Sequence, residues 1–127
     1  MIIVSGLDQG QGGVGLSFRD SNTLYGGSGY RISFDAQGAW TFGYGTGGTD
    51  HPLMGGTCPY FITGFNQPNF ITVKVQGSQI EATVNNHDLF TTTDTTLKMG
   101  MVGMEMGTGN NGEATVVFND AKVWQLN

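Results

Sequence analysis

Charged side chains are scarce in this sequence, because Asp, Glu, Lys and Arg make up only 12% of its 127 residues. Soluble domains ordinarily carry about twice that share. Uncharged polar residues and glycine must therefore cover much of the surface. Such a surface is typical of a turn-rich β-protein and favours partners that are polar but uncharged.

Cations are the scarcest of the charged residues: five Lys and Arg stand against ten Asp and Glu, for a net charge of −5. The five are scattered along the chain as Arg19, Arg31, Lys74, Lys98 and Lys122. A nucleic-acid backbone or an anionic membrane surface is bound through clustered cations. We therefore expect neither nucleic acid nor a membrane surface as a partner.

Cysteine and long apolar runs are also lacking. Cys58 is the only cysteine, which excludes an intrachain disulfide and leaves the redox compartment open. We expect Cys58 to be a buried small apolar residue rather than a reactive thiol. No run approaches the roughly 20 apolar residues of a membrane helix, and no charged-then-apolar signal segment opens the sequence, so no membrane insertion is expected.

Glycine is in excess, with 22 residues against an ordinary share of about 7%. Gly or Pro interrupts almost every stretch that could form an amphipathic helix, whereas β-branched and aromatic residues alternate with polar ones between turn signals. The length predicts a single domain, residues 1–127. Strands are expected at 1–5, 13–20, 29–35, 39–45, 59–63, 69–76, 79–85, 88–92, 99–106 and 114–125. Evenly spaced short strands predict an all-β fold, a two-sheet antiparallel sandwich or jelly roll.

The same pattern predicts turns and core faces. Asp35–Gly38 should form a hairpin turn with Gly38 at φ > 0, and Gly77-Ser78 a type II′ turn. Asn110–Gly112 should form another turn, and Asn119-Asp120 should bulge the last strand. Alternation directs one set of side chains into the core: Ile71, Val73, Val75, Ile80, Ala82 and Val84. A second core layer is expected from Val102, Met104, Met106, Val116, Phe118 and Val123.

Residues 46–58 form the one long stretch without a strand pattern. A long loop in a compact sandwich is more often functional than a short one. We therefore expect this segment either to contribute to a binding site or to be mobile.

Catalytic and cofactor motifs are weak. The pattern G-x-G-x-x-G occurs at Gly10–Gly15, Gly43–Gly48 and Gly107–Gly112, but a dinucleotide fingerprint needs a helix after it and none is expected. No pair of carboxylates of the glycoside-hydrolase kind shares a strand face. The neighbours Asp50 and His51 should point to opposite faces if they lie on a strand. We expect a protein that is not an enzyme, with a hydrolase as the alternative.

A metal site is not expected either. Five aspartates fall at expected strand ends: Asp8, Asp20, Asp50, Asp94 and Asp120. Loop carboxylates are ligands that calcium prefers, yet these form no ordered ligand run, and Asp is common in turns. No cofactor is expected, and calcium remains the alternative.

Aromatic residues provide the best binding signal. Tyr30 and Phe34 share one face of their expected strand, and Trp40 and Tyr44 share one face of the next strand. We expect one of these rows to face the core and the other to be exposed, where Trp and Tyr rings could stack on sugars; the alternative is that the rings fill the core. The candidate ligand-binding residues are Tyr25, Tyr30, Trp40, Tyr44, Asp50 and His51.

Two stretches carry a family resemblance. Residues 12–45, GGVGLSFRDSNTLYGGSGYRISFDAQGAWTFGYG, resemble the G-x-x-F-R…Y-x-F-x-I-x-x-x-G-x-W run of concanavalin A-like, laminin-G-like jelly-roll domains. Residues 73–86, VKVQGSQIEATVNN, are similar to the block V-x-V-x-G-x-x-I-x-x-x-V-N-G of the same family. Here Asn86 replaces the Gly of the turn, which can survive because Asn tolerates left-handed geometry.

The resemblance implies a concanavalin A-like jelly roll of the kind attached to bacterial surface, sensor and glycoside-processing proteins. It further implies a non-catalytic carbohydrate-binding or adhesion module, extracellular or at the cell surface, with a polysaccharide or glycan as partner. Family members usually carry strands ahead of the position that matches Met1, so the first strand or strands should be missing. An unpaired edge gives the alternative of a structural subunit of a surface assembly or filament. In such an assembly, Met1–Val4 would add a strand to the unpaired sheet edge of another chain, producing a homo-oligomer or fibre.

Overall fold

The structure, a computed structural model, describes residues 2–5, 13–21, 27–63, 67–107, 115–118 and 122–123. In these ranges the chain is all-β. Its strands are β1 (Ile2–Ser5), β2 (Gly13–Asp20), β3 (Gly29–Asp35), β4 (Ala39–Thr46), β5 (Thr49–Thr57), β6 (Gln67–Asn69), β7 (Ile71–Gln76), β8 (Gln79–Val84), β9 (His87–Thr93), β10 (Met101–Gly107) and β11 (Thr115–Phe118). None of the described elements is a helix that could cross a membrane.

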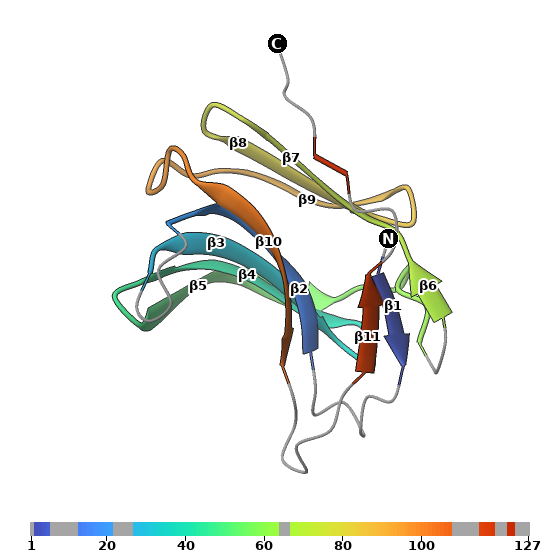
Figure 1. Cartoon of the computed structure of the whole chain (residues 1–127). Coiled ribbons are helices and arrows are strands. Elements are labelled where there is room, and N and C mark those ends of the chain that lie inside the picture. Colours follow the sequence, from blue (N-terminus) through green and yellow to red (C-terminus); the bar gives the residue numbers. More distant parts are fainter. Residues whose placement is uncertain are drawn as a thin grey trace.

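Two antiparallel sheets form the sandwich. The larger has the strand order β10-β2-β3-β4-β5, and the smaller, β7-β8-β9, lies over it (Figure 1). A third sheet, β11-β1-β6, is joined to the smaller one because only Phe70 separates β6 from β7. Every pairing is between antiparallel strands, as the predicted sandwich requires.

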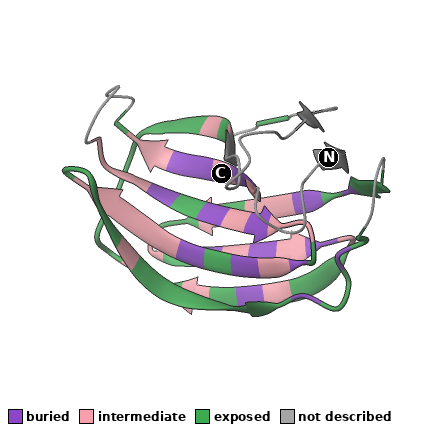
Figure 2. Cartoon of the chain, turned by 90° about the horizontal axis from the view of Figure 1, so that it is seen from below, coloured by how far each residue is buried: buried purple, intermediate pink, exposed green. Residues whose placement is uncertain are grey.

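The core fills the space between the two sheets of the sandwich. Buried residues alternate with more exposed ones along β3 and β8, which is the period of two expected where one strand face is covered. Figure 2 shows bands of buried and more exposed residues along strands of the larger sheet. Phe90 of β9 packs against Phe42 of β4, with ring centroids 4.8 Å apart. The predicted inward face of β7 and β8 is confirmed: Ile71, Ile80, Ala82 and Val84 are buried, and Val73 and Val75 pack against the core.

Both aromatic rows face the core, so the expectation that one of them is exposed is wrong. In the β3–β4 hairpin, Phe34 lies opposite Trp40 and Tyr30 lies opposite Tyr44. Residues directly opposite each other in an antiparallel pair share a face of the sheet. Because the hairpin register sets Phe34 against Trp40, the two rows cannot point in different directions.

Three predicted turns are confirmed. Gly38 has a φ of 85°, and its N–H donates to the carbonyl oxygen of Asp35 over 3.1 Å. Gly77 has a φ of 61°, in line with the first central position of a type II′ turn. Asn85 and Asn86 both adopt the left-handed region, at φ 51° and 66°, so the Val84-Asn85-Asn86 turn keeps its shape without the glycine.

The segment 46–58 is a hairpin rather than an irregular loop, which corrects the sequence-based expectation. Gly47 and Gly48 have φ values of 57° and 83°, the two positive values that a tight two-residue hairpin needs. The chain then returns as β5, where Pro52 is tolerated because β5 is the last described strand of its sheet. The prediction of a strand at 59–63 is wrong, because that segment contains turns and irregular backbone.

The prediction of a second core layer is wrong for those of its residues whose side chains the structure describes. Val102 is 53% exposed and Met104 48% exposed, and Val123 is also exposed. The physical reason is width: β10 is an outermost described strand of a five-stranded sheet that is covered by a three-stranded one. The side chains of Met106, Val116 and Phe118, the turn at 110–112 and the bulge at 119–120 lie outside what the structure describes.

The first described strand is already paired within its own chain. β1 lies between β11 and β6, with Ile3 opposite Val117 on one side and Pro68 on the other. The segment considered as a donor for strand exchange is thus used to join the two ends of the same molecule.

Candidate functional site

The site lies on the face of the larger sheet that points away from β7-β8-β9, here called the outer face. Strand register assigns to it, among others, Gly13, Gly15, Ser17, Arg31, Ser33, Thr41, Gly43, Asp50, Gly55, Gly103 and Glu105. Five of these eleven residues are glycines, so backbone forms much of the floor. A Cβ on Gly55 would lie only 2.8 Å from the carbonyl oxygen of Trp40, and no side chain could be added there without movement.

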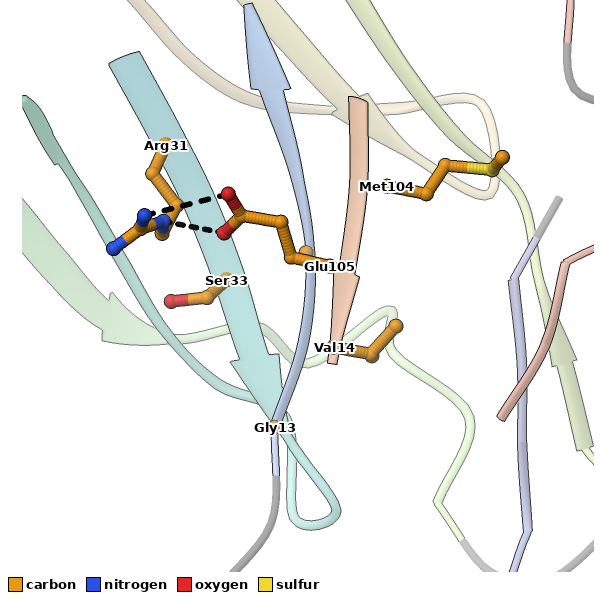
Figure 3. A pocket seen from close by; sticks show the side chains of 7 residues that line it. Gly13, Val14, Arg31, Ser33, Met104 and Glu105 are labelled. Carbon is orange, nitrogen blue, oxygen red and sulfur yellow. Dashed lines mark hydrogen bonds and ion pairs between the residues drawn. The ribbon is translucent and has the colours of Figure 1, made fainter. Parts of the chain in front are cut away.

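Three charged side chains from different strands meet on this face. The guanidinium of Arg31 (β3) pairs with the carboxylate of Glu105 (β10) through two of its nitrogens: Nε, and Nη2 at 3.3 Å from Oε1 (Figure 3). Asp50 (β5) approaches from the other side, with Oδ1 3.7 Å from Nη1 of Arg31. The Arg31 side chain remains 50% exposed. An ion pair this exposed contributes only about 0–1 kcal/mol to stability, so stability alone gives little reason for it.

A depression opens beside this ion pair. It is lined by Gly13, Val14, Gly15, Arg31, Ser33, Met104 and Glu105. Figure 3 shows Arg31, Ser33 and Glu105 on one side of the sheet, with Val14 and Met104 pointing to the other. Val14 and Met104 therefore line the depression near their backbones, while its polar wall comes from the outer face.

Hydroxyl groups extend the polar surface across the sheet. Ser33 and Thr41 are register partners, and their hydroxyl oxygens lie 3.0 Å apart in a hydrogen bond. Arg31 keeps N–H donors on Nη1, because its contact with Asp50 is longer than a hydrogen bond. The outer face therefore offers fixed donors and acceptors side by side, an arrangement that can bind a ligand rich in hydroxyl groups.

The sequence-based candidates are mostly elsewhere. Tyr30 is fully buried and Trp40 is 9% exposed, so both rings belong to the core. Tyr44 and His51 stack on each other, with ring centroids 4.7 Å apart, on the inner side of the β4–β5 hairpin. Asp50 points to the outer face, so Asp50 and His51 lie on opposite faces, as predicted for neighbours on a strand. Of the five candidates that the structure describes, only Asp50 reaches the depression's ion pair. Tyr25 lies outside the described residues.

The hydroxyl of Tyr30 is already used within the fold. It donates to the carboxylate of Asp94 and accepts from the backbone N–H of Leu97 at 3.1 Å. Burial, reinforced by the bond to Asp94, raises the pKa of the Tyr30 hydroxyl. Partial burial by itself would raise the pKa of the Asp94 carboxyl, but its hydrogen bonds from Tyr30 and Thr96 outweigh that effect and hold this pKa below its ordinary value. The pair fastens the segment after β9 to the larger sheet.

Sequence reasoning missed Arg31, Ser33, Thr41 and Glu105. A signal was present in the glycines: Gly13 and Gly15, like Gly43 and Gly45, are spaced two residues apart on strands. Residues at that spacing lie on one face. An excess of glycine on one face of a sheet exposes backbone there, and the neighbouring polar side chains then mark the floor of a site.

Two further predictions can be placed on the structure. Gly43–Gly48 runs from β4 into the hairpin turn and opens no helix. Cys58 is buried, as expected for a small apolar residue. Among the described residues no three His, Cys, Asp or Glu side chains group as metal ligands would.

Comparison with known proteins bears on the fold. No protein-family model and no curated protein sequence matches the chain. The structure is similar to the carbohydrate binding module CBM66 from Bacillus subtilis, with a TM-score of 0.68 and 17% identity, over 91% of this chain and 66% of that one. It is also similar to sheep galectin-11 in a complex with glycerol, with a TM-score of 0.62 and 16% identity, over 91% of this chain and 86% of the galectin.

The fold is a concanavalin A-like jelly roll. The family resemblance of the sequence is confirmed at the level of architecture. This jelly roll spans just under two thirds of the length of the CBM66 chain. Identities of 16–17% show a shared fold alone.

Proposed function

We propose that this jelly roll is a non-catalytic carbohydrate-binding module that holds a polysaccharide or glycan on its outer face. The observation that carries the proposal is the Arg31–Glu105 pair, flanked by Asp50, beside a depression floored with glycine. Sugar hydroxyls both donate and accept hydrogen bonds. A guanidinium next to carboxylates supplies both kinds of partner, and Glu105 orients the guanidinium before a ligand arrives.

The similar structures support this proposal, since one is named as a carbohydrate binding module and the other is a galectin. The low content of charge in the sequence supports it as well, because a surface of mostly uncharged polar groups suits a polar, uncharged ligand. We place the module outside the cell or on its surface, where polysaccharide partners are found.

Binding rather than catalysis is proposed because of how the carboxylates are arranged. Hydrolysis of a glycosidic bond uses two carboxyl groups that flank the bond. Here the Arg31 guanidinium lies between Asp50 and Glu105 and interacts with both, so the place between the two carboxylates is taken.

The test is a glycan array followed by calorimetry with the glycan that gives the strongest signal. Arg31→Ala should weaken binding by tenfold or more, because it removes a charge-assisted donor worth about 1.5–3 kcal/mol. Lys74→Ala is the matched control, because Lys74 is an exposed cation on β7 of the smaller sheet, and it should bind as the wild type does. Equal affinities of the Arg31 variant and the wild type would contradict the outer face as the site.

A second candidate function, a structural subunit of a surface assembly, is favoured by one observation. β10 is an outermost described strand of its sheet and carries exposed apolar side chains at Met101, Val102 and Met104. Such an edge can pair with another chain. Sedimentation velocity and negative-stain imaging test this function. Oligomers of the wild type that are lost in a Val102→Lys variant would support this function, and a wild-type protein that stays monomeric at high concentration would rule it out.

A further inference from the structure

A second pair of exposed rings lies away from the outer face. The ring of Tyr60, in the segment between β5 and β6, stacks on the imidazole of His87, the first residue of β9. Their centroids are 3.8 Å apart and their planes differ by 5°. Tyr60 is 45% exposed and His87 is also exposed. The stack covers one face of each ring, which leaves the other face and the edges as the parts of the ring that a ligand could contact.

The segment that carries Tyr60 is held on both sides by core residues. Cys58 and Phe61 are buried, and the Phe61 ring stacks on Phe34 with a centroid distance of 5.3 Å. The Cys58 N–H donates to the carbonyl oxygen of Gly38 over 2.9 Å. Tyr60 is therefore one of two exposed residues, with Pro59, between two anchored ones, and its backbone has little freedom.

The strand that carries His87 is fastened to the same segment by Asn85. The side-chain amide of Asn85 donates to the carbonyl oxygen of Tyr60 over 2.7 Å, and its oxygen accepts from the N–H of Phe70 over 2.9 Å. The left-handed Asn85-Asn86 turn leads directly into His87. The same asparagine thus holds the backbone on which both rings are carried, which lowers the conformational entropy that a bound ligand would cost.

The surface near the stack includes polar and apolar residues. Asn86 is exposed in the turn directly before His87, and Phe70, hydrogen-bonded through its backbone to Asn85, is 45% exposed. Asp88 follows His87 on β9 and lies on the opposite face of its sheet, with Thr83. No lysine or arginine occurs in 58–63 or 85–88. Rigid aromatic rings beside an amide group, on two segments without Lys or Arg, suit a neutral sugar better than an anionic ligand. An aromatic face contacts the C–H groups of such a sugar, and the polar side chains bind its hydroxyls.

We propose that Tyr60 and His87 form a second sugar-binding platform, defined by Tyr60, His87 and Asn86, that takes a neutral sugar ring on the outer face of the Tyr60 ring. This inference rests on the proposed carbohydrate-binding function, but the platform shares no residue with the outer-face site. Two sites on one module increase the affinity for a long polysaccharide that can reach both.

The test is a two-dimensional amide NMR titration of the full chain with three neutral hexasaccharides: cellohexaose, laminarihexaose and xylohexaose. We expect signals of residues 60–62 and 85–88 to shift with at least one of them. In Tyr60→Ala the affinity at this platform should fall about tenfold, the loss of one stacked ring, whereas Tyr60→Phe should keep it. His87→Ala gives a second variant that removes the stack without touching the loop.

The outcomes separate the two sites. Shifts confined to Arg31, Ser33, Glu105 and their neighbours would overturn the platform and leave the proposed function standing. Shifts confined to 60–62 and 85–88 would support the platform and overturn the outer face as a site. Shifts at the platform that persist unchanged in Tyr60→Ala would overturn the role of the ring, and no shift at either place with any of the three sugars would overturn the platform.

Discussion

The indole of Trp40 in β4 stacks on the ring of Phe90 in β9, with centroids 5.4 Å apart and planes that differ by 13°. This contact joins the two sheets of the sandwich, and both residues are buried. A tryptophan that the sequence offers as a sugar-stacking residue is therefore part of the core.

Replacing Trp40 with Ala should lower the free energy of unfolding by about 3–5 kcal/mol, the usual cost of removing a large buried aromatic ring. Urea denaturation followed by circular dichroism measures this change. Thr41→Ala is the control, because Thr41 points outward next to Trp40, and it should change stability little. A Trp40→Ala variant that keeps its stability but loses glycan binding would contradict the core assignment.

Asn85 should be far more important than its exposed neighbour Asn86. Asn85→Ala removes the bonds to Tyr60, Asn69 and Phe70 and places Ala at a φ of 51°, so we expect a loss of about 2–4 kcal/mol. Asn86→Gly should be neutral or slightly stabilising, since a two-residue turn of this kind favours Asn-Gly. Thermal unfolding of both variants is the measurement, and equal melting temperatures would refute the difference in role.

The bond between Tyr30 and Asp94 should make stability depend on pH at both extremes. The pKa of Asp94 is lowered on folding, so its stabilisation is present above the pKa of an unfolded Asp, about 4, and is lost as the pH falls through the folded value. The pKa of Tyr30 is raised, so its contribution is present below about 10 and is lost as the pH rises through the folded value.

This dependence can be measured with Asp94→Asn. The difference in unfolding free energy between the wild type and this variant should stay constant from about pH 5 to pH 9 and shrink below about pH 4. A difference that does not change with pH on the acid side would show that the carboxylate does not contribute through its charge.

A side chain at position 48 should destabilise the protein for conformational rather than steric reasons. Nothing lies within 4 Å of a Cβ built there, yet its φ is 83°. Gly48→Ala should therefore lower stability by about 1–2 kcal/mol through backbone strain alone. Thr49→Ala, in the adjacent strand position, is the control for a change of similar size at an exposed site. A neutral Gly48→Ala variant would mean that the hairpin turn can adopt another geometry.

The sequence by itself determined the local structure. Period-two alternation predicted most strands and the inward faces of β7 and β8, because alternation depends only on the geometry of one strand. The turns at Gly38, Gly77 and Asn85-Asn86 followed from the residues that tolerate positive φ. The segment 46–58 was misjudged because two glycines in a row resemble a loop, although they also close a tight hairpin.

Tertiary structure decided what the faces do. Hairpin register placed both aromatic rows in the core, the unequal widths of the sheets left Val102 and Met104 exposed, and strand order brought Arg31 and Glu105 together from residues 74 positions apart. Each of these depends on how strands neighbour one another across the sandwich. A single strand's sequence carries no information about that arrangement, because the same alternation is compatible with either face being covered.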